Sequence, residues 1–202
     1  MLALSGAQRT GKTALAKAFS EATLIPYMPS RTVDIIKSMG LDITKPMDIE
    51  TRFEFQDNVL NQHLEDVSSV KVASITDRST LDFASYLMLE VGNECPQKYE
   101  DRVLEYVNKC LEQASKIYFG IVLVQPGIPF VVEENKYPPS VVRQELMNVT
   151  CLGLLNDKRC DTNGFFLQRN RTEIGLRVQS VVNIWNHITG HYSSLIQEST
   201  LH

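Results

Sequence analysis

The sequence predicts one α/β domain in which helices cover both faces of a parallel β-sheet. Apolar runs alternate with amphipathic stretches along the chain, which is typical of parallel strands joined by crossover helices. A glycine-containing motif lies between the first apolar run and the first helical stretch. With 202 residues, 43% of them hydrophobic, the chain is long enough for one well-buried domain and leaves little for a second.

The first half of the chain contains three strand patterns and four helix patterns. Residues 2–4 form a short apolar strand, and a helix begins near Ala14. We expect a second strand at residues 23–27, followed by a short helix. Apolar residues then recur at helical spacing from Asp48 to about Ser68, which predicts a long helix with one buried face. Residues 70–75 predict a buried strand, and residues 81–87 continue as a helix.

The second half repeats this alternation. A helix over roughly 97–115 leads to the most apolar run of the chain, residues 117–124, which we interpret as a central strand. A helix over 141–155, a strand over 164–167 and a final helix to about Ile188 follow. We expect residues 1–188 to form the domain and residues 189–202, which have no strong pattern, to form a C-terminal tail.

The glycine-containing motif, residues 6–13, fits G-x-x-x-x-G-K-[ST] between a strand and a helix, and we call it the phosphate loop. Its glycines let backbone N–H groups surround a polyphosphate, to which the following helix adds its own unpaired N–H groups. The lysine would reach the β- and γ-phosphates, and the threonine hydroxyl would hold Mg²⁺. A chance turn is the alternative, but strand, loop and helix all agree. We therefore expect ATP and Mg²⁺ to bind at Gly6, Ala7, Gln8, Arg9, Thr10, Gly11, Lys12 and Thr13.

A second polar group, Asp77 and Arg78, follows the strand predicted at residues 70–75. The carboxyl ends of parallel strands form the ligand-binding edge of such a sheet, so Asp77 would lie beside the phosphate loop. Asp77 could hold Mg²⁺ or accept the proton of an attacking hydroxyl, and Arg78 could pair with a phosphate oxygen. The alternative is structural, because Asp77, Ser79 or Thr80 could cap the next helix. We favour catalytic roles for Lys12, Asp77 and Arg78.

Further cations are candidates for binding an acceptor substrate. Arg31 follows the second predicted strand, although it could be a solvated residue at a helix start. Residues 131–143 form a polar insertion that could close over the phosphates as a lid and bring Lys136 or Arg143 to the transferred group. An ordinary exposed loop is the alternative.

Two other segments carry candidate site residues. Arg171 follows the last strand and would lie near the purine of ATP, although Thr172 could simply cap the final helix. Glu54 and Gln56 on the long helix could face the acceptor, but we favour a solvated face for both.

Composition excludes several functional classes. The formal net charge of −4 argues against a surface that coats nucleic acid, and no apolar run is long enough to span a membrane. The strand pattern begins at once, so we expect no signal peptide and a cytoplasmic location. The four cysteines lack C-x-x-C spacing and are expected to be reduced thiols, and the histidines show no metal-ligand spacing.

The order of these motifs resembles the P-loop kinases of small molecules. It is most similar to the family of nicotinamide riboside kinase-like and related ATP-binding proteins of bacteria and phages, with thymidylate and deoxynucleoside kinases as relatives. The matching segments are residues 6–13, 77–79, 129–136 and 170–172. The lid differs from the arginine-rich pattern of such kinases, because it offers a lone lysine.

This resemblance implies a three-layer P-loop sandwich with a small lid. It also implies Mg²⁺-dependent transfer of the ATP γ-phosphoryl group to a nucleoside- or nucleotide-like acceptor, in the cytoplasm of the host if the protein is phage-encoded. A homodimer is compatible with the resemblance. A P-loop ATPase that switches conformation with a protein or DNA partner is the alternative, and a catalytically inactive ATP-binding module is a third hypothesis. A GTPase is disfavoured because [NT]-K-x-D is absent.

Overall fold

The protein forms a five-stranded parallel sheet between two layers of helices, in a computed structural model that describes residues 1–42, 44–92, 95–129 and 140–199, with side chains as far as Gly190. The strand order is β2-β3-β1-β4-β5, and each neighbouring pair is parallel. The strands are β1 (Leu2–Ser5), β2 (Tyr27–Met28), β3 (Ile75–Thr76), β4 (Gly120–Val124) and β5 (Gly164–Leu167). This architecture confirms the predicted α/β class.

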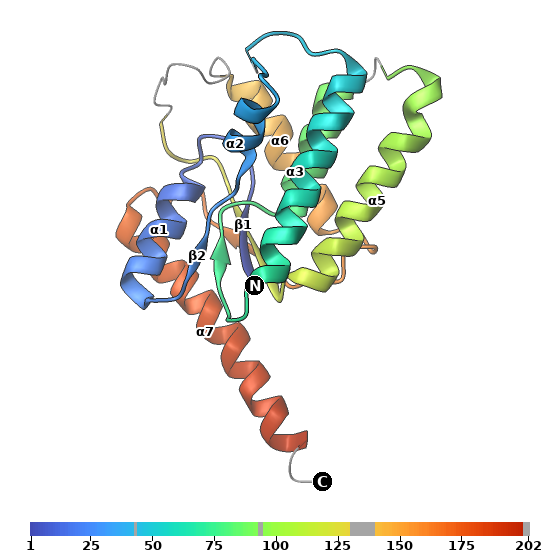
Figure 1. The fold of residues 1–202 in the computed structure, drawn as a ribbon. Helices are drawn as coiled ribbons and strands as arrows, with labels where there is room; N and C mark the ends of the chain where they lie inside the picture. Colours follow the sequence, from blue (N-terminus) through green and yellow to red (C-terminus); the bar gives the residue numbers. More distant parts are fainter. Residues whose placement is uncertain (43, 93–94, 130–139, 200–202) are drawn as a thin grey trace.

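The helices lie on the two faces of the sheet (Figure 1). Helices α1 and α7 pack against each other on one face, and the other helices belong to the opposite layer. Their bounds are α1 (Lys12–Thr23), α2 (Thr32–Ser38), α3 (Ile49–Ser69), α4 (Thr80–Val91), α5 (Glu100–Ile117), α6 (Val141–Leu155) and α7 (Ile174–Ser199), with a short 3₁₀ helix at Gln97–Tyr99.

Alternation along the central strands produces two separate cores. Leu2 and Leu4 of β1 point into the core with α1 and α7, whereas Ala3 between them belongs to the core with α3 to α6. Val122 and Val124 of β4 join the first core, and their neighbours Ile121 and Leu123 join the second. Successive strand side chains point to opposite faces, so one apolar run supplies both layers.

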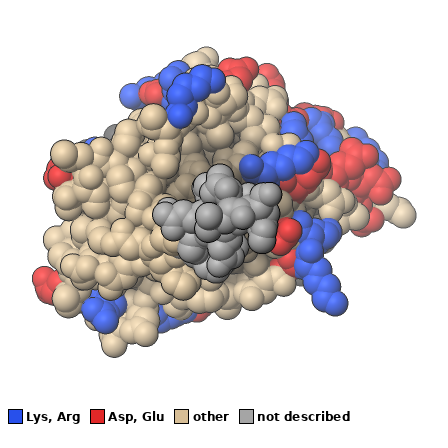
Figure 2. Space-filling model, turned by 90° about the horizontal axis from the view of Figure 1, so that it is seen from below, with Lys and Arg blue, Asp and Glu red and all other residues tan. Residues whose placement is uncertain are grey.

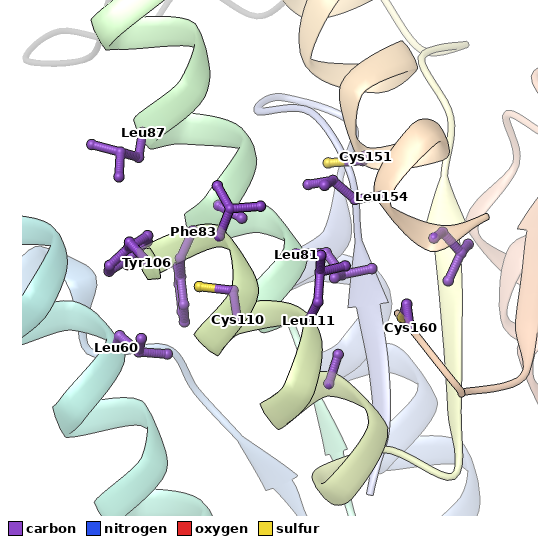
Figure 3. Packing of buried hydrophobic residues seen from close by; sticks show 14 of the residues in the cluster. Leu60, Leu81, Phe83, Leu87, Tyr106, Cys110, Leu111, Cys151, Leu154 and Cys160 are labelled. Atoms are coloured by element: carbon purple, nitrogen blue, oxygen red, sulfur yellow. The ribbon is translucent and has the colours of Figure 1, made fainter. Parts of the chain in front are cut away.

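The larger core lies between α3, α4, α5 and α6, where Phe83, Tyr106 and Leu111 pack together (Figure 3). Cys110 and Cys151 are fully buried in this core, and burial raises the pKa of each thiol to about 12. All four cysteines are free, as the sequence predicts.

The sequence places three strands too early. Residues 71–73 are exposed, and β3 contains only Ile75 and Thr76 because pairing with β1 and β2 begins there. The strand expected at 23–27 is Tyr27–Met28, since α1 continues to Thr23 and Leu24 then takes a left-handed conformation with φ 61°. Likewise, β4 starts at Gly120 because α5 continues through Ile117.

The final helix is longer than the sequence suggests. Helix α7 does not end near Ile188 but continues to Ser199, and its C-terminal part projects from the body of the protein (Figure 1). Residues 189–199 contain one glycine and no proline, so nothing in them interrupts helical hydrogen bonding.

The surface of the described residues has neither a membrane-spanning helix nor, on the face seen in Figure 2, a continuous basic patch. None of the helices in these ranges is both long and apolar enough to cross a membrane. At the end of the molecule opposite the carboxyl edge of the sheet, basic and acidic side chains alternate around the rim (Figure 2). The described residues on this face therefore differ from the continuous basic surface of a protein that coats nucleic acid.

Candidate functional site

The glycine-containing motif forms a loop at the carboxyl end of β1, directly before α1. A Cβ atom on Gly6 would lie 2.8 Å from the carbonyl oxygen of Val124, so only glycine lets the loop pass the end of β4. Gly11 has φ 79° and occupies the N-cap position of α1 without a capping side chain. The first N–H groups of α1 therefore have no side-chain cap, and this end of the helix can bind an anion.

Lys12 folds back onto its own loop. Its Nζ donates to the carbonyl oxygens of Gly6 and Ala7 at 2.6 and 2.7 Å, and the side chain is almost fully buried. Burial lowers the pKa of Lys12, while Asp82, whose Oδ1 lies 3.9 Å from Nζ, opposes that shift. A polyphosphate would offer this ammonium stronger acceptors than the two carbonyls.

Asp82 joins the phosphate loop to the start of α4, a contact that the sequence analysis missed. Its Oδ1 accepts from the backbone N–H of Gly6 at 3.1 Å. Its Oδ2 accepts from the N–H and hydroxyl of Ser79 at 2.9 and 3.0 Å, which completes a capping box. The spacing of Ser79 and Asp82 indicates the cap, but the contact with Gly6 spans 76 residues and has no local signal.

Asp77 and Thr13 meet at the ligand-binding edge. The Thr13 hydroxyl donates to Oδ2 of Asp77 at 2.5 Å, and the N–H of Ser30 donates to Oδ1 at 3.0 Å. Ser79 rather than Asp77 is the N-cap of α4, so the capping alternative does not explain Asp77. Burial, followed by the charge of Asp77, raises the pKa of Tyr27.

The oxygen atoms of Thr13 and Asp77 fit a Mg²⁺ ion bound jointly with phosphates and water, because Mg²⁺ prefers hard oxygen ligands and few protein groups. The described residues contain no group of three or more His, Cys, Asp or Glu side chains that could hold a metal by itself. A cation at this position would therefore depend on a bound nucleotide.

A cavity of about 540 Å³, its open mouth included, adjoins the phosphate loop. Its walls combine apolar side chains with a few polar groups, and they include Gln8 of the loop and Arg78 after β3. The Arg78 guanidinium lies 5.4 Å from the centre of the Tyr86 ring. The other lining residues come from α2, α3 and α4: Thr32, Ile36, Phe55, Gln56, Val59, Phe83, Tyr86 and Glu90.

Gln56 corrects one expectation about the long helix. It is 4% exposed and lines the cavity, whereas Glu54 lies on the exposed face that we expected for both residues. Gln56 shares a face of α3 with Phe53 and Leu60, which are also buried. The helical spacing of these residues could have revealed its position.

Glu90 lies at the cavity between two arginines. Its Oε1 accepts from Nη2 of Arg143 at 2.8 Å, and its Oε2 pairs with Arg52. Arg143, the last residue of the predicted lid segment, belongs to α6, the helix expected over 141–155, which begins at Val141 after its N-cap Ser140. The hydroxyl of Ser140 accepts from the Arg143 N–H, so residues 141–143 of the predicted lid segment form the first turn of this helix.

The remaining predicted cations lie apart from these contacts. Nε of Arg31 lies 3.2 Å from Oδ2 of Asp66 on α3, and the Arg31 side chain is 57% exposed. Among the described residues of that segment, Thr32 rather than Arg31 lines the cavity. Arg171 is exposed in the turn after β5, where its N–H donates to Gln168. Lys136 lies outside the described residues.

Two side chains from distant elements contact the phosphate loop without having been predicted. Nε2 of Gln144 on α6 donates to the carbonyl oxygen of Gln8 at 3.0 Å. Nη2 of Arg177 on α7 donates to the carbonyl oxygen of Thr10 at 2.7 Å. These contacts span 136 and 167 residues, so they depend on the tertiary fold.

Comparison with known proteins gives a family and a fold. A family model described as an AAA domain matches residues 1–125. Three structures of deoxyadenosine kinase from M. mycoides resemble the chain at 13% identity, with bound dCTP, with the products dCMP and a flexible dCDP, and with bound dATP. Their TM-scores are 0.67, 0.66 and 0.64, over 92%, 93% and 92% of this chain and 98% of each structure. No curated protein sequence matched the chain.

Proposed function

This chain belongs to the AAA domain family, and from that premise we propose that it is an ATP-dependent phosphotransferase acting on a small nucleoside- or nucleotide-like acceptor. One observation carries the proposal: a single cavity is lined both by Gln8 of the phosphate loop and by Arg78 after β3. A molecule in that cavity would lie next to the terminal phosphate of a nucleotide bound to the loop. Such proximity is what phosphoryl transfer requires.

The loop and the strand ends would divide the chemical roles. Lys12 would exchange the carbonyls of Gly6 and Ala7 for phosphate oxygens, and the N–H groups of the loop would bind the rest of the polyphosphate. Thr13 and Asp77 would hold Mg²⁺, which neutralises phosphate charge when bound. Arg78 would orient the acceptor oxygen or the transferred group, and Asp77 would alternatively accept the proton of an acceptor hydroxyl.

The cavity supports an acceptor with a flat heterocyclic part. Phe55 and Phe83 provide aromatic walls against which a flat ring can stack. The Gln56 amide carries both donors and an acceptor, so it can hydrogen-bond the polar edge of a nucleobase. The deoxyadenosine kinase structures contain deoxynucleotides, which is in keeping with this choice of acceptor.

A screen of acceptors tests the proposal. ATP consumption would be measured with Mg²⁺ against deoxynucleosides, ribonucleosides, nucleoside monophosphates and ribosylated vitamins. We expect one class to increase turnover by about tenfold or more over water, because positioning an acceptor is worth several kcal/mol. A phosphorylated product detected by mass spectrometry would identify the accepting group as a hydroxyl or a phosphate.

The same measurement separates the alternatives. If ATP hydrolysis is rapid, has the same rate with and without every acceptor, and becomes faster with DNA or a protein partner, the protein is a conformational switch. ATP binding without turnover under every condition would indicate a binding module. Either result would overturn the phosphotransferase proposal.

Several parts of the proposal remain predictions. These are the extent of the catalytic unit at residues 1–188, a lid over 131–143, the roles of Lys136 and Arg171, a homodimer, and a cytoplasmic location. Arg31 and Arg143 stay candidates for acceptor binding only if they exchange their present partners, Asp66 and Glu90, for the acceptor.

A further inference from the structure

We propose that Arg177 is a further nucleotide-binding residue. Its buried guanidinium, which contacts the backbone of the phosphate loop, supplies positive charge to a polyphosphate bound by that loop. This inference rests on the nucleotide-binding part of the proposed function and not on phosphoryl transfer. Arg177 belongs to α7, one turn after its start, and is therefore far in sequence from the glycine-containing motif.

The geometry brings the guanidinium against the loop backbone. Nη2 donates to the carbonyl oxygen of Thr10 at 2.7 Å. Nη1 lies 2.8 Å from the position that a Cβ atom on Gly11 would occupy. Gly11 therefore has a second role besides its left-handed conformation, because a side chain there would displace Arg177.

The charge of Arg177 has no counter-charge among the described residues. Its side chain is 4% exposed, and the one hydrogen bond that its guanidinium makes to a described residue goes to the neutral carbonyl of Thr10. Its Nε is buried without a partner among these residues. Burial lowers the pKa of Arg177, and no acidic side chain among the described residues opposes this shift. Lys12, in contrast, has the Asp82 carboxylate nearby.

An isolated buried cation is costly unless an anion joins it. The loop that Arg177 contacts is the part of the protein built to hold a polyanion. A bound triphosphate would supply the missing negative charge at short range, where the low dielectric of the interior strengthens the attraction. Arg177 would thus favour the nucleotide-bound state at the expense of the unliganded state.

A purely structural role predicts a different behaviour. If Arg177 only fastened α7 to the loop, its removal would destabilise the unliganded protein and leave nucleotide affinity unchanged. If it stores an uncompensated charge, removal would leave the unliganded protein as stable or more stable and weaken nucleotide binding.

The test compares Arg177→Met with Arg159→Met in the full chain. Both changes remove one positive charge, but Arg159 is exposed, precedes β5 at the opposite edge of the sheet and pairs with Asp157. Binding of ATP and of inorganic tripolyphosphate, each with Mg²⁺, would be measured by titration calorimetry. Melting temperature without ligand would be measured alongside, and Arg177→Lys would show whether charge alone restores binding.

We expect Arg177→Met to lower the affinity for ATP and for tripolyphosphate by about tenfold or more each, as for the loss of a charge-assisted contact. Its melting temperature without ligand should equal or exceed that of the unaltered protein, Arg177→Lys should recover part of the affinity, and Arg159→Met should bind normally. A lower melting temperature with normal affinity would overturn the inference. A loss of affinity for ATP but not for tripolyphosphate would also overturn it, because the two ligands share the polyphosphate. If the unaltered protein binds both ligands and Arg177→Met weakens that binding, but no acceptor is phosphorylated, the proposed reaction fails and this inference stands.

Discussion

Replacing Asp77 with asparagine tests the proposed chemistry most directly. Asparagine keeps the size of the side chain and an oxygen that can accept from the Ser30 N–H, so the contact at 3.0 Å survives. The other oxygen becomes an amide group that can donate to the Thr13 hydroxyl, and the negative charge is lost. The substitution therefore removes the charge while keeping the local hydrogen bonds.

The expected effects on stability and rate differ in size. Exchanging a charged acceptor for a neutral one should change the free energy of unfolding by about 1 kcal/mol. Loss of a carboxylate that orders the metal or accepts a proton should slow turnover by ~10²-fold or more, which corresponds to about 2.7 kcal/mol of barrier. The loss of rate should therefore clearly exceed any loss of stability.

The assay is acceptor-stimulated ATP consumption with Mg²⁺, together with thermal unfolding of the same samples. Asp48→Asn is the matched control, because Asp48 is exposed and caps α3 by accepting from the Thr51 N–H at 2.9 Å. Asparagine caps helices as well as aspartate does, so this control should retain both stability and turnover. Near-normal turnover in a folded Asp77→Asn protein would refute the assignment of Asp77 to the chemistry.

Three further predictions concern the lysine, the cavity and a buried histidine. Lys12→Ala should abolish turnover while the protein still folds, because Asp82 keeps its other donors; normal activity would show that the phosphate loop is misassigned. Gln56→Leu should raise the acceptor KM about tenfold or more with ATP affinity unchanged, since one buried hydrogen bond is lost; an unaltered KM would remove Gln56 from the acceptor site. Burial lowers the pKa of His63 from 6.5 to about 4, so the unfolded chain binds this proton at higher pH than the folded one. The resulting stability is present above pH 6.5 and is lost as pH falls toward 4, by up to about 3 kcal/mol; urea titrations should show a flatter pH dependence for His63→Gln, and an identical one would contradict this.

Parts of the site that are local in sequence could be predicted. The motif at residues 6–13 specifies its own loop, and parallel strands place their carboxyl ends at one edge. The meeting of Thr13 with Asp77 follows from these two facts, even though the strand before Asp77 is much shorter than its apolar pattern indicates. Val72 shows why: a β-branched residue in an apolar run is 61% exposed here, since pairing rather than propensity sets the strand bounds.

Contacts that depend on packing between elements far apart in the chain could not be predicted from the sequence. Arg177 is an example, although it shares a stripe of α7 with Val181 and Ile188, both of which are buried. Helical spacing could have marked it as a charged residue on a core-facing stripe, but its contact with Thr10 required the fold. The continuation of α7 to Ser199 was missed because residues 189–199 carry no regular apolar pattern.

The contact of Asp82 with Gly6 has a consequence for how substrate preference can change. Phe83, Tyr86 and Glu90 of α4 line the cavity. The first turn of the same helix is hydrogen-bonded to the phosphate loop through Asp82. A shift of α4 that reshaped the cavity would also pull on the loop that holds the nucleotide. New preferences should therefore arise by exchanging side chains on α3, where the cavity wall can be rebuilt without disturbing the donor side of the reaction.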